Sequence, residues 1–504
     1  MQKGLEELRQ ITRECQLLAE SSAVLGWDQE TYIPPLAIPE RGEQLALLQS
    51  LAHERLAGDR VGELLDSLGC SSAAPEGTAC EDELDRAYLR ELFRQHSRAV
   101  KLPGALVADF ARATSAGQAA WVKAREADDF SLFRNELSVL LDLTQQKAEA
   151  IGYDDQPYDA LIDEFEPWMS TAEVDRVFRA LESDLSSLAA EIADRPQVDD
   201  AFLRQSFPAE KQRDLARRVV SDLGYDFDRG RIDETAHPFT TTLGAHDVRI
   251  TGRFREDYLG TGLFGLIHEF GHALYEQGFD EQIMGNILAT GTSLGIHESQ
   301  SRTWENAVGR SRSFWERYLP VAAEYFPSQL GGIELDRFYR GVNRVEPTYI
   351  RIDADEVTYS LHIILRFRLE LALLSGDLAL NDLPTAWRDL SEKLIGIRPE
   401  RSAEAELQDI HWSMGAMGYF PTYALGNLYG AQFQAAMERE LGDVAALVRN
   451  GEFEAIRTWL KEKIHRHGAS RSASQLCLDV TGEELDADYF MRYLGKKYGE
   501  IYAL

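Results

Sequence analysis

Apolar residues recur three and four positions apart along most of the chain, which is the spacing of one face of an α-helix. This pattern predicts helices over residues 3–25, 39–57, 81–101, 104–126, 130–151, 427–440 and 452–465. Breaking residues at 71–77 indicate a loop, and the segment 27–35 reads as a turn that ends in two prolines. The pattern therefore favours a mainly helical protein.

A further helix is marked clearly at its start. Ser170 and Glu173 have the spacing of a capping box, in which each side chain bonds to the backbone N–H of the other residue. The apolar stripe that follows consists of Val174, Val177, Phe178, Leu181, Leu185 and Leu188. We interpret this stripe as core without a functional role.

Residues 237–254 depart from the helical pattern. Apolar Val248 and Ile250 alternate with polar residues at 247, 249 and 251, which is the periodicity of a strand with one buried face. Such a sheet edge can bind an extended peptide by strand addition. The alternative is a small structural sheet with a solvated polar face.

The segment 261–275 combines an apolar helical pattern with candidate chemistry. His268 and His272 are four residues apart, so one helix face can offer two imidazole nitrogens to one metal ion. Glu269 projects beside that face, where its carboxylate can accept a proton from a water that the metal activates. We expect Thr261 to cap this helix and Gly278 to end it. The alternative is a core helix that carries incidental polar residues.

A catalytic zinc needs a third protein ligand and an open position for water. Glu298 is the candidate, because it lies 26 residues beyond His272 in a second predicted helix that follows residues 291–292. His297 competes with it, but adjacent helical residues diverge by about 100°, so one of the two reaches the metal. In the alternative interpretation, Glu298 is the partner of Arg302 in a surface salt bridge.

The composition narrows the function classes. The 504 residues include 53 basic and 84 acidic side chains, and the net charge of −31 repels phosphate backbones and anionic membranes. We therefore expect no nucleic-acid or membrane partner, and the charge is typical of a solvated surface. No secretory signal or apolar run of membrane-spanning length is visible. The four scattered cysteines are too few for a disulfide framework, so we expect a cytoplasmic protein with reduced thiols.

Five short motifs follow one another in a recognisable order and spacing. They are HPF at 237–239, DVRIT at 247–251, HEFGH at 268–272, HESQ at 297–300 and QDIHW at 408–412. This set closely resembles the carboxypeptidase Taq family of thermostable metallocarboxypeptidases, and the resemblance extends from 27–29 to 418–427. One departure is Ala405, where the family has a glycine, which changes local backbone freedom and leaves the candidate side chains untouched.

The resemblance implies a fold and a function. It implies a two-lobed helical metallopeptidase similar to angiotensin-converting enzyme and neurolysin, with a deep central groove and a small β-sheet beside the zinc helix. Residues 1–504 would form one catalytic unit, with two helical lobes flanking the groove. Zinc is the expected metal and cobalt is possible. Members of the family typically form homodimers and remove single residues from peptide C-termini with broad tolerance.

The residues suggest roles in such a reaction. Glu269 would accept a proton from the attacking water and pass it to the leaving amine. The tetrahedral intermediate needs hydrogen-bond donors in addition to the metal. By analogy with angiotensin-converting enzyme, His411 and Tyr423 are the candidates, and Tyr419 competes with Tyr423.

An exopeptidase must also bind a free terminal carboxylate, for which a guanidinium is the natural partner. Arg351 and Arg249 are the candidates. The alternative for each is a structural ion pair with a nearby carboxylate, namely Asp355 or Glu356 for the first and Asp247 for the second. His237 is either a contact to the peptide or a structural histidine.

We therefore predict a metal-dependent carboxypeptidase that acts on unfolded peptides. A peptidyl-dipeptidase or endopeptidase would use the same metal centre with a groove that is open beyond the carboxylate anchor. A catalytically inactive peptide-binding scaffold is the other alternative, although such a protein has no need for Glu269.

Overall fold

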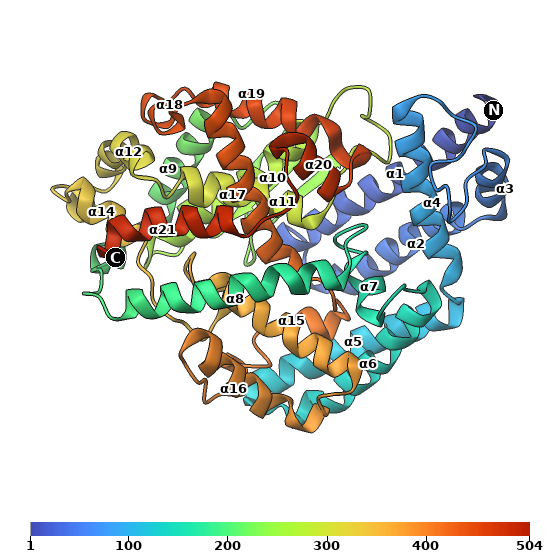
Figure 1. Cartoon of the computed structure of the whole chain (residues 1–504), viewed down its shortest axis with the longest axis horizontal. Helices are drawn as coiled ribbons and strands as arrows, with labels where there is room; N and C mark the ends of the chain where they lie inside the picture. Colours follow the sequence, from blue (N-terminus) through green and yellow to red (C-terminus); the bar gives the residue numbers. More distant parts are fainter. Residues whose placement is uncertain (1) are drawn as a thin grey trace. The chain divides into compact units, whose positions relative to one another are not determined.

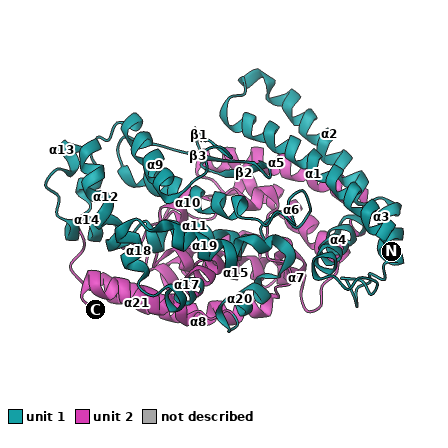
Figure 2. Cartoon of the chain, turned by 90° about the horizontal axis from the view of Figure 1, so that it is seen from above, with its two compact units in different colours: residues 1–100, 199–342, 433–484 teal, residues 101–198, 343–432, 485–504 magenta. Residues whose placement is uncertain are grey.

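The computed structural model describes residues 2–504, and these residues are mainly helical (Figure 1). They form two compact units, each assembled from three separate segments of the chain (Figure 2). Unit 1 comprises residues 1–100, 199–342 and 433–484, and unit 2 comprises residues 101–198, 343–432 and 485–504. The predicted fold class, mainly α with a small sheet, is confirmed.

Unit 1 contains the sheet and most of the shorter helices. Its α-helices are α1 (Gln2–Thr31), α2 (Ile38–Leu56), α3 (Asp59–Ser67), α4 (Glu83–Lys101), α9 (Ala209–Leu223), α10 (Leu259–Gln277), α11 (Leu294–Arg302), α12 (Arg312–Tyr325), α13 (Pro327–Leu330), α14 (Leu335–Val342), α18 (Val444–Asn450), α19 (Phe453–Lys463) and α20 (Ala473–Thr481). A short π-helix (Thr303–Val308) continues directly from α11.

Unit 2 is helical. Its α-helices are α5 (Gly104–Ala127), α6 (Ser131–Ile151), α7 (Pro157–Ile162), α8 (Thr171–Ala193), α15 (Tyr359–Ser375), α16 (Leu383–Ile395) and α21 (Asp488–Tyr502). Helix α17 (Pro421–Leu441) begins in unit 2 and ends in unit 1. The capping box at the start of α8 is confirmed, and its predicted apolar stripe is buried.

The predicted turn at 27–35 is wrong in its first half, because α1 continues to Thr31. No proline interrupts the backbone hydrogen bonding before Pro34, and the N–H groups of Tyr32 and Ile33 both bond to the Asp28 carbonyl. The longer helix places Trp27 against the sheet, with its ring 4.3 Å from the guanidinium carbon of Arg249. This stacking explains why an aromatic residue is needed so close to the end of the helix.

The sheet has the strands β1 (Ile232–Glu234), β2 (Thr240–Gly244) and β3 (Asp247–Gly252), in the order β1-β3-β2. Strand β3 pairs parallel with β1 and antiparallel with β2. The predicted strand is confirmed, and Val248 and Ile250 are fully buried. Its polar face is not fully solvated as the alternative supposed, since Thr251 is also buried and its hydroxyl accepts the Phe239 N–H.

Helix α10 carries the HEFGH motif and is buried along most of its length. It begins at Leu259 after the extended residue Tyr258, so Thr261 is not its cap. The reason is that Leu259 and Gly260 are already helical, so Thr261 lies inside the first turn. The predicted end at Gly278 is confirmed.

One glycine allows α10 and α11 to pack closely. A Cβ at Gly271 would lie 2.6 Å from the Gln300 carbonyl oxygen and 2.6 Å from the Ser301 Cα, distances that no side chain tolerates. The glycine inside the HEFGH motif therefore brings the two histidines of α10 up to α11. Helix α11 is capped by the Ser293 hydroxyl, which accepts the Ile296 N–H.

Between residues 2 and 504, no helix has an apolar stretch long enough to cross a membrane.

Candidate metal centre

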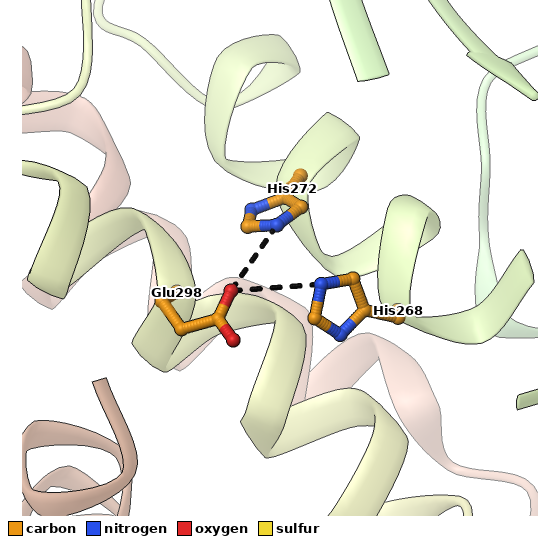
Figure 3. Close-up of side chains that lie close together, drawn as sticks. All are labelled: His268, His272 and Glu298. Carbon is orange, nitrogen blue, oxygen red and sulfur yellow. Dashed lines mark ion pairs between the residues drawn. The ribbon is translucent and has the colours of Figure 1, made fainter. Parts of the chain in front are cut away.

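Three predicted ligands meet between α10 and α11 (Figure 3). The Nε2 atoms of His268 and His272 each lie 3.5 Å from Oε2 of Glu298. One ligand atom from each of these residues lies within 4.8 Å of the others. Two imidazoles and one carboxylate around a common point are a typical donor set for a catalytic divalent cation, so the residues present fit a zinc ion.

His272 and Glu298 have charge states that suit a cation, whereas the carboxylates of Glu298 and Glu305 outweigh burial and raise the pKa of His268. Burial lowers the pKa of His272 to about 3, so its ring is neutral at physiological pH. Burial by itself would raise the pKa of Glu298, but the charges of Arg302 and His268 outweigh it and hold that pKa well below its ordinary value. A neutral imidazole and an ionised carboxylate are the forms that bind a metal.

Glu298 uses its two oxygens differently. Oε1 accepts the Nε–H of Arg302 at 2.7 Å, and Oε2 faces the two histidines. The salt bridge that we considered as the alternative therefore exists, but it is buried and engages only Oε1. Oε2 accepts the Ser301 hydroxyl at 3.0 Å and keeps a second lone pair for a metal. His297, the competing ligand, projects elsewhere, with its ring against His272 at a centroid distance of 4.7 Å.

Each histidine of the centre is held through its other ring nitrogen. Nδ1 of His268 lies 2.9 Å from Oε2 of Glu305, a residue of the π-helix that also pairs with Arg302 and Arg310. Nδ1 of His272 lies 3.1 Å from the backbone oxygen of His297 and 2.7 Å from its Nδ1. These contacts turn both Nε2 atoms toward Glu298, which is the usual function of residues around a metal ligand.

Glu269 is buried beside the cluster, and Thr240 of β2 fixes its position. The Thr240 hydroxyl donates to Oε2 of Glu269 at 2.7 Å. Burial raises the pKa of Glu269 above its ordinary value, which makes the carboxylate a better proton acceptor. Among residues 2–504, no hydrogen bond occupies Oε1.

A second group of predicted residues lies in unit 2. Nε2 of His411 is 3.3 Å from the Tyr423 hydroxyl, and the Tyr419 ring lies 5.1 Å from the His411 ring and 5.3 Å from the Tyr423 ring. Burial lowers the pKa of His411 to about 4, so the ring is neutral. The structure therefore brings His411, Tyr419 and Tyr423 together, and it does not choose between the two tyrosines.

Arg351 is buried in unit 2 and pairs with Asp409, not with either of the carboxylates that we considered. Its Nε and Nη2 lie 3.0 and 2.8 Å from Oδ1 of Asp409, and its Nη1 donates to the Tyr359 hydroxyl. Asp409 also accepts Nε–H of the fully buried Arg366 at 2.7 Å. Two guanidinium groups thus share one carboxylate, which leaves an excess positive charge.

The two proposed partners of Arg351 are engaged elsewhere. Asp355 accepts the backbone N–H and the hydroxyl of Thr358, and Glu356 pairs with Lys497 at 2.7 Å. The alternative that placed Arg351 in a structural ion pair is therefore right about the pair and wrong about the partner, which is Asp409.

The remaining two predicted residues lie in unit 1. Arg249 forms a two-point ion pair with Asp247 at 2.8 and 2.7 Å and stacks on Trp27, as the structural alternative expected. His237 is exposed and has no hydrogen bond to the described residues, which contradicts the alternative of a satisfied structural histidine.

Three residues of the site were not predicted from the sequence. Thr240 contacts the proposed base, Glu276 contacts His297, and Glu305 contacts His268. A signal existed for Glu276, because it lies one helical turn beyond His272 on the same face of α10. A signal also existed for Glu305, because it lies seven residues beyond Glu298, a spacing that places two residues on the same face of a helix.

Comparison with known proteins decides the family. The family model of the carboxypeptidase Taq (M32) metallopeptidases matches residues 7–498. The chain belongs to this family. It is accordingly a metallocarboxypeptidase, a peptide hydrolase, as the five motifs predicted.

Relatives match the chain over nearly its whole length. Thermostable carboxypeptidase 1 of Thermus thermophilus is 42% identical, with 99% of this chain and 98% of that protein covered. Carboxypeptidase 1 of Bacillus subtilis is 39% identical, with 96% of each chain covered. The crystal structure of an M32 carboxypeptidase from Deinococcus radiodurans R1 superposes with a TM-score of 0.95 at 38% identity, with 100% of each chain covered.

Proposed function

We propose that this M32 enzyme is a zinc carboxypeptidase that removes single amino acids from peptide C-termini with broad tolerance, and that His268, His272 and Glu298 hold the metal. The observation that carries the proposal is the convergence of two Nε2 atoms and one carboxylate oxygen beside the buried Glu269. When bound, zinc polarises the scissile carbonyl and lowers the pKa of the attacking water, and cobalt can supply the same chemistry.

Glu269 is the general base in this proposal. The Thr240 hydroxyl orients the carboxylate through Oε2, which leaves Oε1 to take the proton of the attacking water. The same oxygen then delivers the proton to the leaving amine, so Glu269 serves as base and acid in turn. Thr240 fixes the carboxylate in advance, and an oriented group loses less entropy when it reacts.

His411 and Tyr423 supply hydrogen bonds to the oxyanion. His411 is neutral, and its Nδ1 has no hydrogen-bond partner among residues 2–504. Its Nε2 contacts the Tyr423 hydroxyl, so the two side chains fix each other's orientation. Donors that are oriented before the reaction stabilise developing negative charge most effectively. Tyr419 is the alternative to Tyr423 as the hydrogen-bond donor to the oxyanion. If Tyr423 is the donor, we expect Tyr419 to contact the substrate.

Arg351 is the better candidate for binding the terminal carboxylate. Its group in unit 2 retains an excess positive charge, because Arg351 and Arg366 share Asp409. Arg249, in contrast, is neutralised by its two-point pair with Asp247. We assign Arg249 to the stability of the sheet and the exposed His237 to a contact with the peptide. We also propose that residues 1–504 act as one catalytic unit and that the enzyme is a cytoplasmic homodimer.

The test is mass spectrometry of a peptide mixture treated with the metal-free and the zinc-restored protein. The proposal predicts ladders that shorten by one residue at a time from the C-terminus, and only after zinc is restored. Peptides with an amidated C-terminus should persist. Cleavage of amidated peptides would favour the endopeptidase alternative, and the absence of any cleavage would favour the inactive scaffold.

A further inference from the structure

Behind His272, on the side away from Glu298, three polar side chains follow one another in a line. Nδ1 of His272 is 2.7 Å from Nδ1 of His297, and Nε2 of His297 is 2.8 Å from Oε1 of Glu276. The other oxygen of Glu276 accepts the Thr242 hydroxyl at 2.9 Å. The line thus connects α10, α11 and strand β2, and it ends on a carboxylate that forms no hydrogen bond or ion pair with the proposed metal ligands.

The position of each proton in this line can be deduced from the acceptors. The backbone oxygen of His297 lies 3.1 Å from Nδ1 of His272 and can only accept, so this nitrogen of His272 carries the proton. Nδ1 of His297 lies 2.7 Å from this protonated nitrogen, so it must be the nitrogen without a proton. The proton of His297 is therefore on Nε2, where it is donated to Glu276.

Packing around His297 prevents its ring from turning to another partner. A Cβ at Gly291 would lie 2.7 Å from Cδ2 of His297, so the backbone runs directly along the ring edge. The Tyr275 ring lies on another side at a centroid distance of 5.1 Å. The ring is thus held in the one orientation in which its two nitrogens face His272 and Glu276.

We propose that His297 and Glu276 form a relay that keeps His272 in its metal-binding tautomer and increases the electron density on its Nε2. Both are positioning residues, because they act on the metal through His272. The inference rests on the proposed function, since it takes His272 as a ligand. It explains why the family motif HESQ begins with a histidine that does not point at the cluster.

The two histidine ligands are thereby supported in different ways. His268 donates directly to a carboxylate, Glu305, at 2.9 Å. His272 reaches its carboxylate through a second imidazole. Removing such a partner of a metal ligand typically weakens metal binding by about 10–100-fold. The relay therefore predicts that a change at Glu276, which forms no hydrogen bond or ion pair with the three proposed ligands, weakens zinc binding.

The test uses the full-length chain, stripped of metal, and measures the zinc dissociation constant by competition with a chelator. Glu276→Gln preserves shape and removes the charge, and it should weaken zinc binding by about 10–100-fold. His297→Asn and His297→Leu form a pair of equal shape, in which only Asn offers an acceptor near the position of Nδ1. Zinc binding should be weakened more by Leu than by Asn.

A cobalt-loaded sample provides a readout that a change in stability does not alter. The visible absorption bands of bound Co²⁺ should shift in Glu276→Gln, because the donor strength of His272 changes. Glu356→Gln is the control, since it removes a carboxylate from its pair with Lys497 in unit 2, where the Glu356 side chain is 4% exposed against 10% for Glu276. It should lower stability and leave the zinc dissociation constant and the cobalt spectrum unchanged.

The outcomes separate this inference from the proposed function. If Glu276→Gln binds zinc as tightly as the wild type, or if His297→Leu and His297→Asn bind equally, the relay is wrong. In that case His272→Ala should still lose zinc. If His272→Ala binds zinc like the wild type, the proposed metal site itself is wrong.

Discussion

The buried carboxyl of Glu370 leads to a prediction about stability and pH. Glu370 is fully buried on α15 and accepts three hydrogen bonds, from the Tyr158 hydroxyl at 2.6 Å, Trp412 Nε1 at 2.8 Å and the Gly418 N–H at 3.1 Å. Burial raises its pKa from an ordinary value of 4.5 to about 7, because the three donors and Arg366 do not fully offset the loss of hydration.

The sign of the effect follows from which state binds the proton. Below pH 4.5, Glu370 is protonated in the folded and the unfolded chain, and its contribution to stability is fully present. Between pH 4.5 and about 7 the unfolded chain releases the proton and the folded chain keeps it, so the free energy of unfolding falls as pH rises. The difference between the two pKa values corresponds to a loss of roughly 3 kcal/mol.

The measurement compares the wild type with Glu370→Gln by urea unfolding of the metal-free protein, followed by tryptophan fluorescence from pH 4.5 to 8. The variant cannot titrate at this position, so the stability of the wild type relative to the variant should decrease by roughly 3 kcal/mol over this range. Other titrating groups cancel in the difference. A difference that is constant with pH, or that increases with pH, would refute the reasoning.

The same carboxyl has a consequence for the reaction. Glu370 bonds to Trp412, which directly follows His411, and to the backbone of Gly418, which directly precedes Tyr419. In Glu370→Gln the amide N–H₂ faces one of the three donors, which costs about 1–3 kcal/mol for a buried group left without its bond. We expect kcat to fall more than zinc affinity, since the proposed zinc ligands belong to unit 1.

Three further predictions concern the proposed catalytic and packing residues. Glu269→Gln should lower kcat in a peptide assay by about 10²–10⁴-fold, while metal analysis should still find one zinc ion per chain. Unchanged turnover would exclude Glu269 as the base. Arg351→Met should lower kcat/KM for peptides with a free C-terminal carboxylate by about 10–100-fold, as expected for the loss of a charged hydrogen bond. An equal loss for Arg249→Met would contradict the choice of Arg351 over Arg249 as the residue that binds this carboxylate. Gly271→Ala should lower the free energy of unfolding by about 1–3 kcal/mol and weaken zinc binding, because the methyl group pushes α11 away from α10. A variant with wild-type stability and zinc affinity would show that the close packing is unimportant.

The general fold could be predicted because helical periodicity depends on local sequence. The bounds of α5 and α6 agree with the predicted 104–126 and 130–151 to within a residue. The errors arose where a local signal was taken as decisive. The segment 27–35 looked like a turn, but Trp27 lies in α1 and stacks on an arginine of β3, a contact across more than two hundred residues of sequence.

In the candidate site, too, features that depend on local sequence could be predicted and contacts between distant residues could not. His268 and His272 follow from one helix, and Glu298 follows from its distance to a second one, so these three could be named from spacing. The partner of Arg351 could not, since Asp409 lies 58 residues further along the chain. The role that we propose for His297 could not be predicted either, because it depends on the contact with Glu276 and on the ring packing that Gly291 allows.

The most direct test of the central claim is anomalous X-ray scattering at the zinc absorption edge from a crystal of this protein soaked in zinc. We predict one strong peak at about 2.0–2.2 Å from Nε2 of His268, Nε2 of His272 and Oε2 of Glu298. A peak elsewhere, or one that is bound by the two histidines while Glu298 turns away, would contradict the proposed metal centre.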